Sequence, residues 1–328
     1  MSIETLRIEN FKSIKSLKLD CKKINLFIGE PNTGKSNILE ALGVLSHIGH
    51  GSSIKNFVRF EVMTDLYYDR ILEYPIKISF DKESLQIDFR NGRFRGSYCV
   101  QKNDVTTETV DIIFSYNYTG QGHIPKFRAF RKFKFYRFAK NANFPDQNSE
   151  YLIPPDGRNL LAVIMTRKTL RNILNGIFGK FGYRPVFRPQ DGRIEVLKET
   201  EGIIFSFPYS LASETLQRVV FYLAATHSNK DSILSFEEPE AHAFPYYTKY
   251  LAEIIALDKN NNQYFISTHN PYFLTSVLEK APKKEVAIFA TTFQNYQTKV
   301  TPLTEKQKEK ILEDMGYDFF FNIDKFLD

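Results

Sequence analysis

Short runs of apolar residues, separated by turns and by segments with helical spacing, are the dominant pattern of this chain. Residues 24–28, 232–237 and 263–268 are largely apolar and do not alternate with polar residues. Such runs are typical of strands that are buried on both faces. Helical spacing at residues 213–225 and 244–257 predicts an α/β fold with helices packed on a mixed sheet.

The start signals of several helices support this pattern. Asn270-Pro271 is a favourable N-cap and first-turn pair for a helix after the third apolar run. Near the end of the chain, Thr304 and Gln307 have the spacing of a capping box. A further helix is predicted over residues 159–181, where apolar residues recur on one face.

Other segments alternate in the manner of half-exposed strands. Residues 3–19 predict a β-hairpin, and Asn91-Gly92 between two alternating runs is a strong signal for a two-residue hairpin turn. Strand character is also predicted in three further segments, residues 107–116, 127–138 and 194–207.

Residues 29–36, Gly-Glu-Pro-Asn-Thr-Gly-Lys-Ser, fit the phosphate-binding loop at every fixed position. A strand before the loop and a helix after it concentrate backbone N–H groups where a polyphosphate binds, which disfavours a chance glycine turn. We expect Lys35 to neutralise the β- and γ-phosphates of ATP and Ser36 to ligate Mg²⁺. The expected nucleotide contacts in this segment are Gly29, Asn32, Thr33, Gly34, Lys35, Ser36 and Asn37.

Two adjacent acids, Glu237 and Glu238, end the apolar run at 232–237. We expect Glu237 to hold Mg²⁺ through its water shell, opposite Ser36, and Glu238 to orient or deprotonate the attacking water. A pair of exposed acids at a strand end is the simpler interpretation, but the phosphate loop makes it less favourable.

Two more segments are candidates for the same site. His269 follows the apolar run at 263–268, where it can hydrogen-bond the γ-phosphate, although a histidine with its partners in the loop is an equal alternative. A helix that starts at Ser213 points free N–H groups outward, and the γ-phosphate of a second subunit can dock there. Plain helix capping by Ser213 is the alternative that this segment alone favours.

The order of these segments suggests one split nucleotide-binding domain over residues 1–328. Its core is predicted at 1–60 and 200–290, with a β-rich and helical insertion at about 61–199 and a strand-helix tail at 291–328. The insertion has no sustained heptads, so we expect a compact lobe and no coiled coil.

Composition narrows the class of protein. The chain has 328 residues, 42% hydrophobic and 25% charged, as in an ordinary globular protein, and its net charge of +6 permits an acidic partner without requiring one. Cys21 and Cys99 form no metal or disulfide pattern and indicate a reducing compartment. No secretion signal and no membrane-length apolar run is visible, so we expect a cytoplasmic protein without membrane contact.

Residues 126–140 interleave basic and aromatic side chains. Basic groups on phosphates and aromatic rings on bases would suit nucleic acid. An amphipathic strand pair with a solvated basic face explains the same alternation and is the favoured interpretation.

The candidate segments, in this order, resemble the ABC-type ATPase heads of SMC, RecF and OLD-family proteins, and most closely the compact AAA-type ATPases without a coiled coil. Residues 29–36 match the Walker A motif and residues 233–238 match Walker B, with Glu238 at the catalytic position. His269 matches the switch histidine, and residues 213–218 resemble the signature motif, with Ser213 at its serine.

The chain departs from that family in several places. Thr215 stands at the signature glycine, and Glu237 stands where many relatives have aspartate. No glutamine marks the Q-loop, for which Asp65 is only a positional candidate. Too few residues follow about residue 278 for the nuclease domain of OLD proteins, so nuclease activity is not expected.

The resemblance implies an ABC-ATPase-like P-loop fold, with an N-terminal β-lobe and an inserted helical lobe, whose heads form a homodimer on ATP. Its implied output is work on DNA, or gating of a partner such as a nuclease or another effector protein, in repair or in defence against mobile elements. A nucleotide-gated scaffold with little turnover and no contact with nucleic acid is the main alternative. A transporter ATPase is disfavoured by Thr215, by the large β-lobe and by the missing glutamine.

Overall fold

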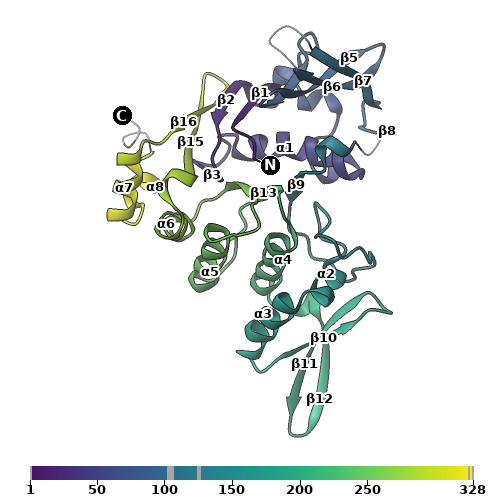
Figure 1. Cartoon of the computed structure of the whole chain (residues 1–328), viewed down its shortest axis with the longest axis vertical. Coiled ribbons are helices and arrows are strands. Elements are labelled where there is room, and N and C mark those ends of the chain that lie inside the picture. The colour runs from purple at the N-terminus through teal and green to yellow at the C-terminus, as the bar shows by residue number, and fades with distance from the viewer. Residues whose placement is uncertain (1, 102–106, 124–126, 324–325, 327–328) are drawn as a thin grey trace.

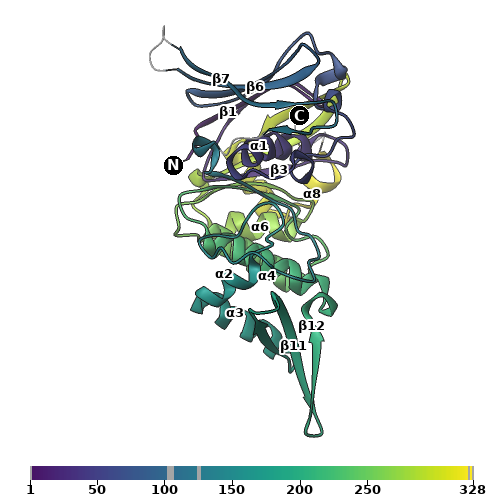
Figure 2. The same ribbon diagram turned by 90° about the vertical axis from the view of Figure 1, so that its right-hand side faces the viewer.

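The computed structural model describes residues 2–101, 107–123, 127–323 and 326, with the backbone alone at 107–112. These residues form a central six-stranded sheet, a seven-stranded antiparallel sheet and a small three-stranded sheet (Figure 1). Helices pack between the two larger sheets and below the central one (Figure 2). The mixed α/β architecture agrees with the predicted class.

The central sheet has the strand order β16-β15-β3-β14-β13-β9. All neighbouring pairs are parallel except β15 and β16. The bounds of its strands are Ile24–Ile28 (β3), Phe133–Tyr136 (β9), Ile233–Glu237 (β13), Gln263–Ser267 (β14), Val286–Gln294 (β15) and Gln297–Pro302 (β16). Strands β3 and β14 are buried at every position, as their unbroken apolar runs predict.

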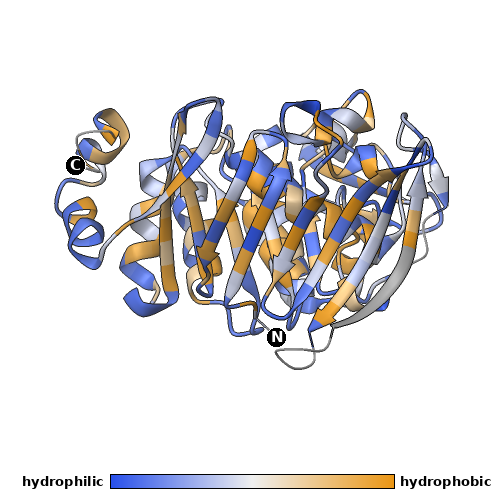
Figure 3. Ribbon diagram, turned by 90° about the horizontal axis from the view of Figure 1, so that it is seen from above, coloured by the Kyte–Doolittle hydropathy of each residue, from blue (hydrophilic) through white to orange (hydrophobic). Residues whose placement is uncertain are grey.

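The antiparallel sheet has the order β2-β1-β4-β5-β6-β7-β8. Its strands are Thr5–Phe11 (β1), Ile14–Asp20 (β2), Ile76–Phe80 (β4), Glu83–Arg90 (β5), Arg93–Gln101 (β6), Thr107–Tyr116 (β7) and Gly122–His123 (β8). Hydrophobic and hydrophilic residues alternate along these strands (Figure 3), because one face packs on the core and the other meets solvent. The Asn91-Gly92 turn joins β5 and β6 as predicted.

Helix α1, Lys35–His50, lies between the two larger sheets. Nearly all of its side chains are buried, and one hydrophobic core joins it to Phe27 of β3 and to Ile8 and Ile78 of the antiparallel sheet. A helix that is enclosed on all sides holds its N-terminus in a fixed position. The phosphate loop immediately before α1 is therefore carried by two rigid elements.

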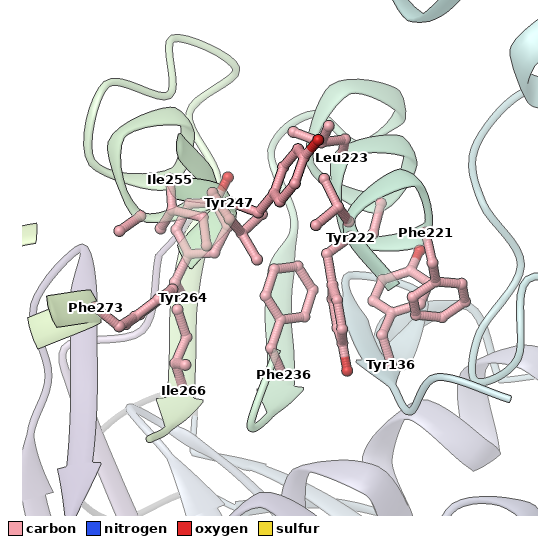
Figure 4. Packing of buried hydrophobic residues seen from close by; sticks show 14 of the residues in the cluster. Tyr136, Phe221, Tyr222, Leu223, Phe236, Tyr247, Ile255, Tyr264, Ile266 and Phe273 are labelled. Atoms are coloured by element: carbon pink, nitrogen blue, oxygen red, sulfur yellow. The ribbon is translucent and has the colours of Figure 1, made fainter. Parts of the chain in front are cut away.

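A second core covers the opposite face of the central sheet. It is built by helices α4 (Glu214–Ser228), α5 (Pro245–Ala256) and α6 (Pro271–Lys280). Phe236 of β13 projects between these helices and contacts the rings of Tyr222 and Tyr264 at centroid distances of 5.0 and 5.9 Å (Figure 4). This packing fixes the carboxyl end of β13, where the two acids begin.

A lobe beyond α4 carries the three-stranded sheet, which projects away from the central sheet (Figures 1 and 2). It contains α2 (Leu160–Thr166), α3 (Lys168–Gly179), β10 (Arg184–Arg188), β11 (Arg193–Thr200) and β12 (Ile203–Pro208). Strand β12 is an edge strand, and every one of its residues is exposed.

Two helices end the described chain, α7 (Glu305–Glu313) and α8 (Tyr317–Phe321). The predicted capping box of Thr304 and Gln307 starts α7, and the predicted N-cap Asn270 accepts a hydrogen bond from the Phe273 N–H at the start of α6. Among the described residues, no helix has both the length and the apolar character that a bilayer span requires.

Three details differ from the sequence predictions. The helix expected over 159–181 is divided into α2 and α3 at Arg167, which has an extended backbone. Of the strand expected over 127–138, only Phe133–Tyr136 forms β9, and a 3₁₀ turn at Arg128–Phe130 precedes it. The β-rich part of the expected insertion is not separate, because β4 pairs with β1 and β9 pairs with β13.

Candidate functional site

The candidate site lies where four parallel strands end side by side. Strands β3, β14, β13 and β9 are neighbours in the central sheet, so their carboxyl ends share one edge. The phosphate loop follows β3, and His269 follows β14. Glu237 ends β13, Glu238 comes directly after it, and Arg137 follows β9. Loops at this edge of a parallel sheet are the usual place for ligand-binding groups.

Two glycines, Gly29 and Gly34, allow the backbone conformation and the close packing of the phosphate loop. Gly34 has φ of 97°, and a Cβ atom there would lie 1.9 Å from Thr298 Oγ1. A Cβ atom on Gly29 would lie 2.1 Å from the Thr291 carbonyl oxygen. Asn32 also has a left-handed φ of 64°, which asparagine tolerates better than most residues. The loop is thus held tightly against β15 and β16.

Polar contacts fix the other loop residues. The Thr33 hydroxyl donates to the Glu30 carbonyl at 2.9 Å and lies 2.9 Å from Thr291 Oγ1. Asn37, on the first turn of α1, donates to Ser13 Oγ at 2.7 Å. Thr33 and Asn37 therefore have protein partners that shape the loop, beside the nucleotide contacts expected of them.

Lys35 is buried and directed into the loop. Its Nζ donates to the carbonyls of Gly29 and Glu30, each at 2.7 Å. Burial lowers the pKa of Lys35 to about 8, although the charges of Glu238 and Glu30 act in the opposite direction. The ammonium is charged at neutral pH and is placed among the groups that would surround a triphosphate.

We expect nucleotide affinity to fall above about pH 8. Free Lys35 loses its proton there, whereas a bound triphosphate keeps the lysine protonated, so binding takes up a proton. Linkage then predicts a loss approaching about tenfold per pH unit. Calorimetric titration with a non-hydrolysable ATP analogue from pH 7.5 upward measures it. The Lys35→Arg variant, whose guanidinium stays charged, should lack the decline; a flat profile in the parent protein would contradict this role for Lys35.

Ser36 and Glu237 come together at the start of α1 and the end of β13. Ser36 is on the first turn of α1, one turn before Glu40, and Glu40 shares Arg59 and Arg137 with Glu237. Burial acts to raise the pKa of Glu237, but Ser36 and the charges of Arg137 and Arg59 outweigh it, so the pKa lies below its ordinary value. A hydroxyl beside an ionised carboxylate is an oxygen donor set that suits Mg²⁺ together with phosphate oxygens.

Two arginines that the sequence analysis did not assign to the site also contact Glu237. Arg59 Nη2 lies 2.9 Å and Arg137 Nε lies 3.0 Å from its carboxylate oxygens. Both arginines also reach Glu40, at 2.7 and 3.1 Å, and Lys12 pairs with the same carboxylate. Glu40 is fully buried on α1. No local motif marks this cluster, since its five members come from five separate segments of the chain.

Glu238 and His269 form a pair at the mouth of the site. His269 Nε2 lies 3.2 Å from Glu238 Oε1, and both side chains are partly exposed. The hydrogen bond from His269 lowers the pKa of Glu238, so the carboxylate is ionised and able to accept a proton. Glu238 has a left-handed φ of 43°, and its N–H donates to the Ser267 carbonyl at 3.0 Å.

A third acid, Glu240, lies behind this pair in the loop after β13. It is buried, and its Oε1 accepts a hydrogen bond from the Thr268 hydroxyl, while Oε2 has no partner among the described residues. Burial raises the pKa of Glu240 to about 7. Thr268 Oγ1 also accepts from the Asn270 N–H at 3.1 Å, so Glu240 links the β13 and β14 loops.

Ser213 lies apart from these groups, at the N-cap of α4. Its side chain makes no capping hydrogen bond, in contrast to the capping alternative considered for it. Thr215 donates to the His242 carbonyl at 2.6 Å and so ties the start of α4 to the loop after β13. The structure does not bring Ser213 to the phosphate loop of the same chain, because each borders a separate cleft.

The side chain of Asp65, the positional Q-loop candidate, makes its contacts within its own part of the chain. Its carboxylate accepts hydrogen bonds from the Glu61 and Val62 N–H groups and pairs with Arg70 at 2.9 Å. On one side, β13 is flanked by β9, and the residue that follows β9 next to the acids is Arg137. Asp65 therefore has no contact with Glu237 among the interactions of the described residues.

The basic run at 126–140 does not form a free cationic face. Lys126 lies outside the described residues, Lys132 pairs with Glu83 at 3.3 Å, and Lys134 is buried against Asn229. Arg137 pairs with Glu40 and Glu237, and Lys140 pairs with Glu214 at 2.8 Å. Most of the described cations of this run thus have protein partners, which weakens the nucleic-acid interpretation. The solvated basic face expected of an amphipathic strand pair is also only partly present.

A family profile described as "AAA domain, putative AbiEii toxin, Type IV TA system" matches residues 24–275, which is well over half of the chain. The chain belongs to this family. The matched span runs from β3 to α6 and includes the phosphate loop, both acids and His269.

Curated relatives match shorter parts of this family member. The uncharacterized protein MJECL10 of Methanocaldococcus jannaschii is 32% identical over 107 residues, 29% of this chain and 47% of that protein. The DNA replication and repair protein RecF of Caldanaerobacter subterraneus subsp. tengcongensis is 30% identical over 94 residues, 25% of this chain and 26% of RecF. An ATP/GTP phosphatase of Helicobacter pylori is 51% identical over 41 residues, 12% of this chain and 11% of the phosphatase. The chain thus matches less than half the length of each relative.

Solved structures resemble the chain over almost its whole length. An SMC head bound to the C-winged helix domain of ScpA has a TM-score of 0.54 at 15% identity, covering 95% of this chain and 100% of that one. An SMC head with an extended coiled coil, bound to the C-terminal domain of ScpA derived from Pyrococcus furiosus, has a TM-score of 0.52 at 14% identity, covering 95% and 99%. The fold is therefore the P-loop NTPase fold of such heads. The predicted relationship to RecF and SMC ATPases is confirmed.

Proposed function

We propose that this chain binds ATP with Mg²⁺ at the phosphate loop and hydrolyses it in a dimer of two heads. The observation that supports the proposal most is that Ser36, on the first turn of α1, is placed close enough to the Glu237 carboxylate to lower its pKa. These groups lie far apart in the sequence, yet they meet beside Lys35, at the N-terminus of an enclosed helix. A site that serves Mg²⁺ and a triphosphate requires this combination.

Each side chain has a defined task in this proposal. Lys35 and the loop amides bind the phosphates, and Ser36 and Glu237 would hold Mg²⁺, which neutralises charge on the transferring phosphoryl group. Glu238 accepts a proton from the attacking water, and His269 holds its carboxylate in place through the hydrogen bond between them. Arg59 and Arg137 fix the position of Glu237.

The position of Ser213 supports the proposed dimer. Its hydroxyl makes no capping bond, and it borders a cleft distinct from the one beside the phosphate loop. A two-fold symmetric dimer would bring Ser213 of each chain to the phosphate loop of the other, where the hydroxyl and the α4 N–H groups would contact the γ-phosphate. The bond from Thr215 to the His242 carbonyl would connect this contact to the loop that follows Glu238.

The names of related proteins suggest what such a dimer acts on. RecF is a relative whose name places it in DNA replication and repair, and the family description refers to a toxin-antitoxin system. We propose that closing and reopening of the two heads either grips DNA or gates a partner protein, such as a nuclease. A nucleotide-gated scaffold with little turnover is the second candidate, because the guanidinium groups on Glu237 compete with Mg²⁺ for its oxygens.

Mixing two inactive variants tests the shared site. We expect Lys35→Ala and Ser213→Ala each to hydrolyse little ATP alone, because every dimer site then lacks one group. A mixture should regain part of the turnover, since one site of each heterodimer combines an intact Lys35 with an intact Ser213. Phosphate release measures the result, and two Lys35→Ala preparations mixed together are the control. Absence of any gain would contradict a site shared between chains.

A further inference from the structure

Helix α8 presents an exposed aromatic pair, here called the aromatic ridge, formed by Tyr317 and Phe321. Their rings pack on each other at a centroid distance of 4.7 Å, and the residues are 62% and 73% exposed. The helix is anchored from its other side by Phe319, which is fully buried and contacts Phe326. Phe319 therefore packs α8 against the core, while the two rings of the ridge remain exposed.

The ridge borders the candidate nucleotide site. A cleft of about 340 Å³ separates α8 from the phosphate loop and is lined by Gly29, Glu30, Pro31, His269 and the residues Phe319–Phe321. One half of the proposed shared site thus has an exposed apolar element directly beside it.

The other half of the proposed shared site has a matching hollow. A groove of about 780 Å³, here called the signature groove, contains Ser213 and Thr215 in its wall. Apolar and aromatic side chains form most of the remaining lining, and two of them, Leu211 and Phe244, are 73% and 69% exposed. Exposed apolar surface of this extent is typical of an interaction site.

The ridge and the groove do not cover each other within one chain. Figures 1 and 2 show α8 beside the central sheet and away from the lobe of α3 and β12. The groove, in contrast, is lined by residues of α3 and β12 and by the first turns of α4 and α5. In the dimer of the proposed function, however, the phosphate loop of one chain faces Ser213 of the other. Helix α8, which lies beside the phosphate loop of one chain, would then approach the groove beside Ser213 of the other.

We propose that the signature groove receives the aromatic ridge of a second copy of this chain. The inference rests on the proposed two-fold dimer and names the contact that would accompany its two ATP sites. Two-fold symmetry gives each dimer two such contacts, because each chain carries one ridge and one groove. Aromatic anchors in apolar pockets are the residues that usually dominate the binding energy of an interface.

Cross-linking tests the pairing directly. The parent is the Glu238→Gln chain with ATP, to which Tyr317→Cys is added in one preparation and Leu211→Cys in another. We expect a short bis-maleimide to join two chains when the preparations are mixed with ATP, and not in either preparation alone. The parent, which retains Cys21 and Cys99, is the control. Equal cross-linking in each single preparation would overturn the pairing.

Polar substitutions provide a second measurement. In the same parent, Tyr317→Glu and Leu211→Glu should each weaken ATP-dependent dimerisation about tenfold or more, with nucleotide affinity of the monomer unchanged. Tyr74→Glu, at an exposed aromatic on the antiparallel-sheet side, is the matched control and should have no effect.

The outcomes separate this inference from the proposed function. A dimer that forms on ATP without cross-linking, and is indifferent to both glutamates, would overturn the inference and leave the shared site in place. A parent that never dimerises on ATP would overturn both. Stronger nucleotide binding by Tyr317→Glu would instead make α8 a cap over its own phosphate loop, which also overturns the pairing.

Discussion

Replacement of Glu238 by glutamine is expected to stop ATP turnover and to leave ATP binding intact. Glutamine keeps the size of the side chain and its contact with His269, but it cannot accept a proton from water. Loss of a positioned general base typically costs about 10²- to 10⁴-fold in rate. The variant should accumulate as an ATP-bound dimer, which light scattering detects as a doubled mass while phosphate release falls.

Glu240→Gln is the matched control for this prediction. Glu240 lies two positions further along the same loop, but it is buried behind Thr268, and its pKa of about 7 means that a neutral group is already tolerated there near neutral pH. Turnover should stay within a few-fold of the parent. If Glu240→Gln stops turnover and Glu238→Gln does not, the base has been assigned to the wrong acid. Unchanged behaviour of Glu238→Gln would favour the scaffold.

Glu40→Gln is expected to give the largest loss of stability among single substitutions at the site. Its carboxylate is fully buried and pairs with Lys12, Arg59 and Arg137. An amide there would leave Lys12 without its acidic partner and the two arginines with Glu237 alone. Removing one partner of a buried ion pair typically costs about 3–5 kcal/mol. We expect about 3 kcal/mol in the free energy of unfolding, near the lower end, because Arg59 is half exposed and can turn to water.

Urea unfolding followed by circular dichroism measures this free energy. Glu309→Gln is the matched control, since its pair with Lys283 at 2.9 Å is exposed on both sides. Such surface pairs contribute about 0–1 kcal/mol, so the control should unfold almost as the parent does. Equal stability of the two variants would mean that the buried cluster does not hold α1 to the neighbouring strands.

The parts of the site that follow from local chemistry could be predicted from the sequence. The phosphate loop is defined by its glycines, and the acids and His269 each end a continuous apolar run. Parallel strands bring such ends to one edge, so Ser36 and Glu237 are expected to lie close together, and Ser36 is near enough to lower the pKa of Glu237. The capping box at Thr304 also follows from spacing alone.

The remaining parts depend on packing between distant segments. Arg59 and Arg137 contact Glu237 because a loop after α1 and the end of β9 converge there, and no spacing rule connects these positions. The alternation of residues 127–138 predicted one long strand, but the first residues instead form a turn whose Phe130 packs in the core. Packing between distant segments also pairs Lys132 with Glu83 and Arg137 with Glu237, two cations that the sequence alone left available to nucleic acid.

A crystal structure of the Glu238→Gln variant with ATP and Mn²⁺ is the most direct test of nucleotide binding at this edge of the sheet, since anomalous scattering locates the metal. We expect the phosphates within residues 29–36 and the metal at bonding distance from Ser36 Oγ, with Glu237 as its other protein ligand, directly or through one water. Phosphates bound elsewhere, or a metal held by Glu240 without Ser36, would contradict this arrangement.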